Sequence, residues 1–157
     1  MASSPAVPAS YRHTQRGSAL LFGVGGVGVV LLVMAALLTR AATPAWPGLV
    51  LAGLIMIVVA GLFFRMTVTV AADSVALEMA HGLVRRSWRL ADVQAAQVVH
   101  TRWYNGWDIH GWGHNWLYNV SGFGAVEMDL ADGARVYIGS DEPERLQQAI
   151  LATRGAR

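Results

Sequence analysis

The sequence contains no cysteine and no lysine. Without cysteine the chain can form no disulfide framework and can offer no thiolate for catalysis or metal binding. Charged residues make up only 14% of the 157 residues, and the formal net charge of +2 is too small to indicate a nucleic-acid partner. Hydrophobic residues reach 54%, which is too apolar for an ordinary soluble domain of this length.

Two uncharged runs account for the excess of hydrophobic residues. Residues 18–39 would span roughly 33 Å as a helix, which is enough for a bilayer core, and residues 47–64 lie near the short end of the spanning range. Arg12 and Arg16 before the first run also fit a signal peptide, but the run is longer than a signal core of about 7 to 15 residues. We therefore predict two transmembrane helices, at 18–39 and 47–64, joined as a hairpin by a turn at residues 40–46.

The distribution of arginine predicts the orientation of this hairpin. The basic residues that flank the helices on the predicted cytoplasmic side are Arg12, Arg16, Arg65, Arg85, Arg86 and Arg89, and Arg40 alone lies in the turn. Cytoplasmic segments carry an excess of arginine and lysine. We expect a multi-pass membrane protein, with residues 1–17 as a cytoplasmic tail and both termini cytoplasmic.

Glycines in the first run satisfy the pattern G-x-G-x-x-G at Gly23, Gly25 and Gly28. No strand is predicted before them and no polar residue lies nearby, so a dinucleotide site is excluded. The spacing of Ala19 with Gly23, and of Gly48 with Ala52, instead favours close helix packing. It is compatible with self-association or with another membrane protein as a partner.

After residue 65 the hydrophobic period changes from that of a helix to that of a strand. Alternation predicts three antiparallel strands, at residues 66–72, 74–80 and 83–90. Residues 91–102 are ambiguous, and we favour a turn at 91–92 followed by a strand.

The last part of the sequence predicts a hairpin and a helix. Residues 125–130 and 134–139 alternate around the turn Ala131-Asp132-Gly133. Ser140 then supplies a helix cap, Pro143 suits a first turn, and an apolar stripe follows at Leu146, Ala149 and Ile150. Residues 66–153 should form an α+β domain of six or seven antiparallel strands, arranged as a barrel or sandwich with a C-terminal helix.

Four short segments of this domain resemble a known family. They are GWDIH at residues 106–110, WLYNVSG at 116–122, AVE at 125–127 and IGSDEP at 138–143. The pattern is similar to that of the small bacterial pleckstrin-homology-like membrane proteins, in which GWGIR is followed by WLYNVSG and by an IGTDEP helix start. The resemblance covers residues 66–153 and implies a pleckstrin-homology-like fold after two membrane helices, in the inner membrane of a bacterium.

The chain departs from that pattern at two positions. Asp108 stands in place of a glycine and His110 in place of an arginine. The second change removes the cation that an anion-binding role at this position would use.

The stretch GWDIHGWGHNW at residues 106–116 allows three interpretations. Its tryptophans, with Trp103 nearby, fit aromatic packing on the sheet, and the glycines permit tight backbone paths. Alternatively, His100, His110 and His114 could ligate a metal ion or haem, although Gly111 and Gly113 disfavour the helix that the spacing of His110 and His114 requires. A third interpretation is a loop that contacts lipid or a partner protein.

The remaining polar residues give little support for catalysis. No serine lies in a recognisable nucleophile motif, and the carboxylates Glu127, Asp129 and Asp132 fit a solvated sheet face and a turn. We therefore expect a non-enzymatic binding or assembly module without a cofactor, and a small metal- or haem-binding membrane protein is the alternative. Candidate residues for binding lipid or a partner are Arg85, Arg89, Trp107, His110 and Trp112.

Overall fold

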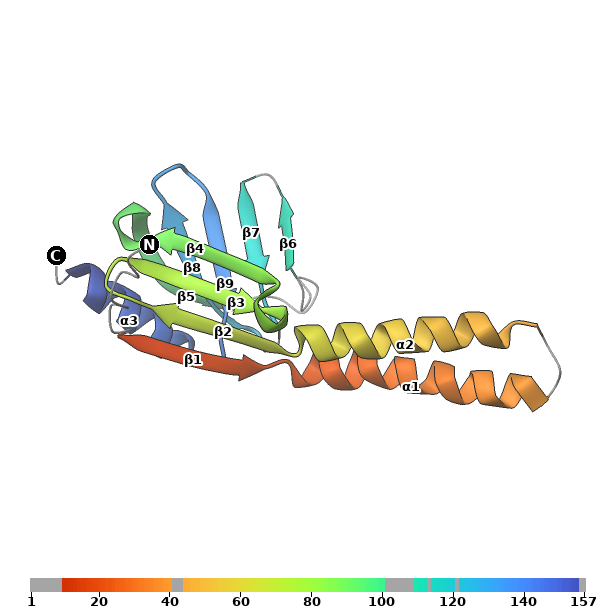
Figure 1. Ribbon diagram of the computed structural model, residues 1–157. Coiled ribbons are helices and arrows are strands. Elements are labelled where there is room, and N and C mark those ends of the chain that lie inside the picture. Colours follow the sequence, from red (N-terminus) through yellow and green to blue (C-terminus); the bar gives the residue numbers. More distant parts are fainter. Residues whose placement is uncertain (1–9, 41–43, 101–108, 113, 121, 156–157) are drawn as a thin grey trace, which may run out of the picture.

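The computed structural model describes residues 10–40, 44–100, 109–112, 114–120 and 122–155, and of residues 109, 110 and 112 it describes the backbone only. Two long helices project as a hairpin from one end of a domain built of strands (Figure 1). The elements are, in chain order, β1 (Tyr11–Arg16), α1 (Ser18–Arg40), α2 (Trp46–Phe63), β2 (Arg65–Val70), β3 (Ser74–Met79), the 3-10 turn η1 (Ala80–Gly82), β4 (Val84–Arg89), the 3-10 turn η2 (Leu90–Asp92), β5 (Val93–His100), β6 (Ile109–Trp112), β7 (Asn115–Tyr118), β8 (Gly124–Leu130), β9 (Arg135–Gly139) and α3 (Pro143–Gly155).

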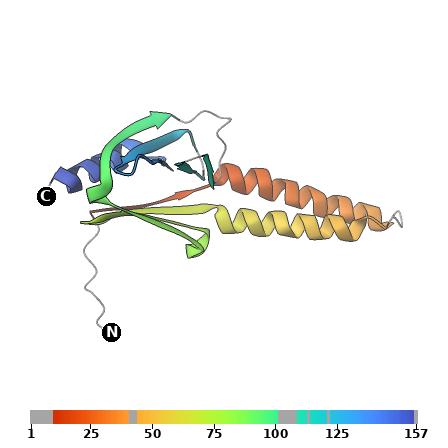
Figure 2. The same ribbon diagram turned by 90° about the horizontal axis from the view of Figure 1, so that it is seen from above.

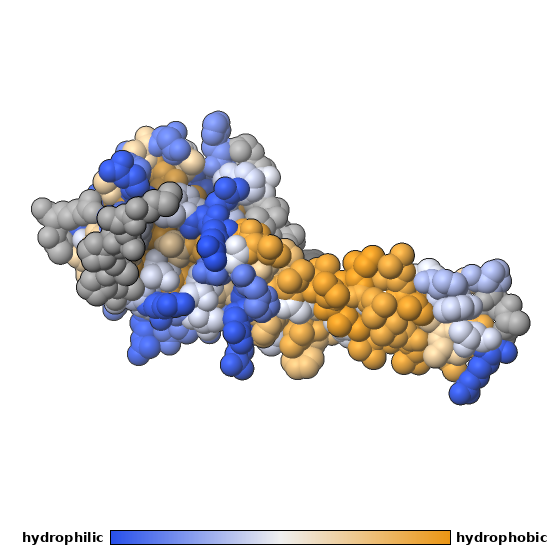
Figure 3. All heavy atoms as spheres, viewed as in Figure 1, coloured by the Kyte–Doolittle hydropathy of each residue, from blue (hydrophilic) through white to orange (hydrophobic). Residues whose placement is uncertain are grey.

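The two predicted apolar helices are present and pack against each other. Both are long and apolar enough to cross a membrane by length and composition, and most of their large side chains are exposed (Figure 3). The helices lie close together at Gly28, where an added Cβ would be 2.8 Å from the carbonyl oxygen of Gly53. The packing contact thus uses these glycines and not Gly23 or Gly48, because a Cβ at either of those positions would meet nothing within 4 Å.

The first sheet contains a strand that the sequence did not predict. Its order is β1-β2-β3-β4, and β1 comes from the segment that was expected to be a tail. Because α1 and α2 form a hairpin, the chain leaves α2 beside the residue at which it entered α1. Arg16 thus pairs with Arg65 in an antiparallel β1–β2 ladder. The prediction of residues 1–17 as a tail is wrong for residues 11–16, because their polar sequence gives no strand signal before the tertiary pairing is known.

The second sheet has the order β5-β8-β9-β7-β6. Its pairs are antiparallel except for β7 and β9, which run parallel. The sheet is therefore mixed, and the expectation of antiparallel strands throughout is wrong at this pair. The strands β6 and β7 form a hairpin inside the aromatic stretch, where the sequence indicated a loop. The described residues therefore contain nine strands, more than the six or seven that were predicted.

The hydrophobic core lies between the two sheets and under α3. Figure 2 shows the sheets as separate layers, with α3 beside the end at which β4 turns into β5. The predicted stripe of α3 is confirmed, since Leu146 and Ile150 are fully buried against strands of both sheets. Ser140 lies ahead of the helix that it was expected to cap, since α3 begins at Pro143 and the Ser140 hydroxyl accepts a hydrogen bond of 3.0 Å from the backbone N–H of Glu142.

The β8–β9 turn gives a direct test of this part of the fold. Gly133 has a φ of +83°, and a β-branched side chain resists that conformation. Gly133→Val should lower the free energy of unfolding by about 1 to 3 kcal/mol. The measurement is thermal unfolding of the full chain in detergent, since a fragment beginning at residue 66 would lack β1. Ala131→Val in the same turn is the control, and equal stability of the two variants would contradict the assigned turn.

Candidate functional site

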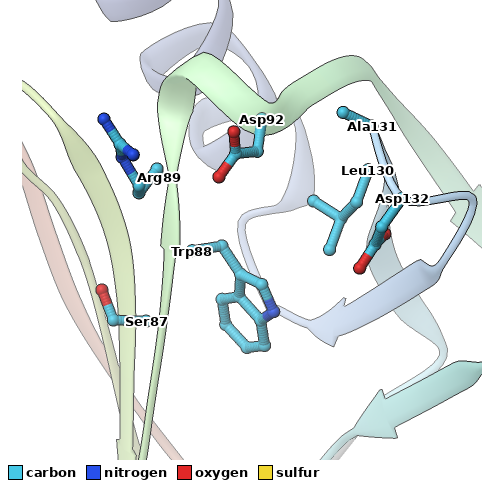
Figure 4. A pocket seen from close by; sticks show the side chains of 7 residues that line it. All are labelled: Ser87, Trp88, Arg89, Asp92, Leu130, Ala131 and Asp132. Atoms are coloured by element: carbon cyan, nitrogen blue, oxygen red, sulfur yellow. The ribbon is translucent and has the colours of Figure 1, made fainter.

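A cleft opens between β4 of the first sheet and the strands β7, β8 and β9 of the second. It consists of two adjoining hollows with volumes of about 630 and 460 Å³. Ser87, Trp88, Leu130 and Asp132 border both hollows. In Figure 4 the ring of Trp88 projects into the first hollow opposite Leu130 and Asp132, whereas Ser87 and Arg89 point away from it.

Three aromatic side chains form the wall of this cleft. Trp88 meets Tyr118 edge to face, with ring centroids 5.7 Å apart, and Trp116 stacks on Tyr118 at 6.3 Å. Tyr118 is 3% exposed and belongs to the core, but Trp116 is 42% exposed. A row of rings that begins in the core and ends at the surface can bury apolar groups of a ligand without any rearrangement.

Charged side chains surround the aromatic wall. Arg86 and His114 border the second hollow, Asp92 borders the first, and Asp132 borders both. All four side chains are exposed. Among the described residues, no group of three or more His, Asp or Glu side chains could hold a metal ion. The cleft thus combines an apolar wall with a rim that carries both signs of charge.

The outer face of the second sheet carries a separate polar network. Glu127 is 7% exposed, and its carboxylate accepts hydrogen bonds from the Tyr137 hydroxyl at 3.2 Å and from the Gln97 amide at 3.3 Å. Arg135 lies 3.4 Å from the same carboxylate and 3.2 Å from that of Asp129. Burial raises the pKa of Tyr137, and the negative charge of Glu127 adds to the rise. The expectation of a solvated Glu127 is wrong, because these partners compensate for its burial.

The structure separates the two arginines that were predicted to share a binding site. Arg85 and Arg89 both lie on the outer face of the first sheet, but Arg85 pairs with Glu78 near the helices, and Arg89 pairs with Ser74 at the other end of β4. They are four residue steps apart along the strand, which is roughly 13 Å. Arg86, which the sequence did not single out, faces the cleft in alternation with them. The alternation of residues along the strand indicated that Arg86 shares a face with Trp88. The sequence could not identify which face of β4 lines a cleft.

The other predicted site residues are placed only in part. Trp103 and Trp107 lie outside the described residues, and for His110 and Trp112 the backbone alone is described, in β6. His100 ends β5 and His110 lies on β6, and these strands are the opposite edges of the second sheet. Measured along the sheet, four strand spacings amount to roughly 19 Å. His100 and His110 thus lie on opposite edge strands of the second sheet, and a metal ion bound by His100, His110 and His114 stays a prediction.

Comparison of the chain with protein-family models gives no match, and comparison with curated proteins gives none. The chemistry of the cleft is consequently the basis on which a function can be proposed.

The different burial of the aromatic side chains leads to a stability prediction. Tyr118→Ala should lower the free energy of unfolding by about 3 to 5 kcal/mol, because it removes a buried ring from the core. Trp116→Ala should cost only about 1 kcal/mol, because the ring is already partly solvated. Thermal unfolding of the full chain, followed by circular dichroism, measures both. A loss at Trp116 as large as that at Tyr118 would mean that the outer ring is part of the core.

Proposed function

We propose that this protein is a membrane-anchored, non-enzymatic binding module that holds an extended segment of another protein in the cleft beside β4. The helices α1 and α2 serve as the anchor, and the domain presents the cleft next to the membrane. The observation that carries the proposal is the position of Trp88, Trp116 and Tyr118 beside the last strand of the first sheet.

The position of β4 favours a peptide over a small molecule as the ligand. In the order β1-β2-β3-β4 it is an edge strand, and an edge strand can pair with an added strand through its backbone N–H and C=O groups. Side chains of the added strand would then alternate toward the aromatic wall. Tryptophan, tyrosine and arginine contribute most of the affinity at many interfaces, and all three occur here in Trp88, Tyr118 and Arg86.

The proposal includes membership of the bacterial pleckstrin-homology-like group that the motifs resemble, with the two sheets and α3 as its barrel. Contacts between motif residues support this assignment. Asn119 of WLYNVSG donates a hydrogen bond of 3.2 Å to the carbonyl oxygen of Gly122, and its side chain fills the space beside Gly139 of IGSDEP. These motif residues thus hold β7, its following loop and β9 together, so the motifs describe the fold more than the ligand.

The proposed ligand can be tested by selecting peptides that bind the protein and then measuring amide hydrogen exchange in β4. Peptides from a display library, selected on the full chain in nanodiscs, should slow amide exchange in β4 when they bind. Arg86→Ala and Trp88→Ala should each weaken that binding by about 30-fold, as expected for residues worth about 2 kcal/mol.

Leu151→Ala is the matched control, because Leu151 is an exposed apolar residue on α3, outside the cleft. Circular dichroism shows whether each variant is folded, and Arg86 is exposed, so its loss should leave the fold intact. Selected peptides that leave β4 exchange unchanged, or that bind the Arg86 variant equally well, would refute the proposal.

The proposed location is a bacterial inner membrane with both termini in the cytoplasm. Arginine bias supports it, because Arg16 and Arg65 lie where both helices meet the domain and Arg40 ends α1 at the other side. A fusion of alkaline phosphatase after Arg157 should therefore show no activity in the periplasm, and a fusion within the turn near Pro44 should be active. The reverse pattern would place the domain outside the cytoplasm.

A further inference from the structure

Leu83 is the most exposed large hydrophobic residue that the described part of the domain places outside α1 and α2, with 75% of its surface accessible. It follows η1, in the turn between β3 and β4. Met66 pairs with Met79, so residues 80–83 continue past the start of β2 to the level of Arg65 and Phe64. The ring of His81 lies 6.2 Å from that of Phe64, which directly follows α2. The turn thus sits against the end of a helix that is long and apolar enough to cross a membrane.

The backbone of this turn holds Leu83 in place. Ala80, His81 and Gly82 have φ values of +50°, +57° and +91°. Two successive residues with a Cβ in the left-handed region are uncommon and strained, and such strain often accompanies a functional role. The N–H of Leu83 donates a hydrogen bond of 3.2 Å to the carbonyl oxygen of Ala80, which closes the turn. The strained backbone is thus used to present an apolar side chain outward.

Two arginines flank the turn. The guanidinium of Arg65 lies over the ring of Phe64, 5.2 Å from its centroid. Arg85 folds back over the turn, since a Cβ built on Gly82 would lie 2.7 Å from its Nη2 atom, and its ion pair with Glu78 is long, at 3.5 Å. An apolar side chain flanked by two cations fits a membrane surface, because the hydrocarbon can take up the apolar side chain and the anionic headgroups just outside it can contact the cations.

We infer that residues 80–83 form a membrane-contacting foot, in which Leu83 inserts into the bilayer interface beside α2 while Arg65 and Arg85 contact anionic headgroups. The occupant of this surface is the lipid bilayer that also surrounds the helices. Figure 3 shows the hydrophobic surface of the helices continuing onto the adjoining end of the domain. The inference rests on the proposed membrane anchoring, but it does not depend on which side of the membrane carries the domain or on what binds in the cleft.

The foot fixes the domain relative to the membrane. The β1–β2 ladder connects the domain to the helices at one edge of the first sheet, and an antiparallel pair of strands can bend. A second contact at the start of β4 would restrict that bending. It would also hold the neighbouring cleft at a constant height above the lipid.

Site-specific labelling can test the foot in the intact protein. Because the chain has no cysteine, one introduced cysteine gives a unique attachment site for an environment-sensitive fluorophore. The variants are Leu83→Cys at the foot, Val30→Cys within α1 and Leu151→Cys on α3, and all three parent side chains are exposed. Each labelled full-length protein is reconstituted in vesicles of phosphatidylcholine and phosphatidylglycerol that contain a lipid with a nitroxide quencher near its headgroup.

We expect strong quenching and blue-shifted emission for the label at position 83, and neither for the label at position 151. Position 30 reports separately on the anchor. If the label at position 30 is in lipid but that at position 83 behaves like position 151, the foot is refuted and the membrane anchor stands. If the label at position 30 is itself exposed to water, the proposed anchor fails and the foot fails with it.

The role of the arginines is tested in the same system. Omitting phosphatidylglycerol should reduce the quenching at position 83, and Arg85→Gln should make the quenching less dependent on that lipid. Arg89→Gln is the matched control, because Arg89 lies on the same strand and face but at the far end of β4. Equal dependence on phosphatidylglycerol in the Arg85 and Arg89 variants would overturn the assignment of headgroup contact to Arg85.

Discussion

The pairing of β1 with β2 is the constraint on which the rest of this structure depends. These strands lie far apart in the sequence and meet only because α1 and α2 form a hairpin, after which Arg16 and Arg65 become neighbours. The N–H of Gly17 donates to the carbonyl oxygen of Phe64 at the junction, so the helix hairpin continues into the sheet without a flexible linker. Pairing with β1 also removes the exposed edge that β2 would otherwise present.

The same strand connects the first sheet to the C-terminal helix. Gln15 is buried, and its side-chain carbonyl accepts a hydrogen bond of 3.0 Å from the backbone N–H of Asp141. His13 lies 2.6 Å from the carboxylate of Asp141, just before α3 begins. The short polar strand β1 therefore runs from the end of the domain that adjoins the helices to the start of α3. The domain thus includes residues that precede the two apolar helices in the sequence.

Strand β4 brings the two proposed interaction surfaces together. Leu83 directly precedes its first residue, and Trp88 lies near its last, so the membrane foot and the aromatic cleft are at opposite ends of one edge strand. A strand fixed by lipid at one end offers its edge to a partner at a defined height. This arrangement would suit a module that selects proteins already close to the membrane.

The sequence by itself determined those features that depend on local chemistry. Uncharged runs predicted both helices, alternation predicted β2, β3 and β4, and the Asp132-Gly133 turn predicted the β8–β9 hairpin. Pro143 in the first turn and the stripe of Leu146 and Ile150 predicted α3. In each case the residues that form the element also carry its signal, as periodicity or as turn and cap chemistry.

Only the tertiary structure decided the features that depend on distant partners. The strand β1 has no hydrophobic alternation and forms because the helices place it beside β2. Arg86 and Trp88 lie on the face of β4 that the second sheet covers, while Arg85 and Arg89 lie on the opposite face. Sequence spacing placed Arg85 and Arg89 correctly on one face, but it could not show that Arg85 lies at the end of β4 near the helices and Arg89 at the far end. Position relative to a second sheet or a helix end is set by packing, and no local pattern encodes it.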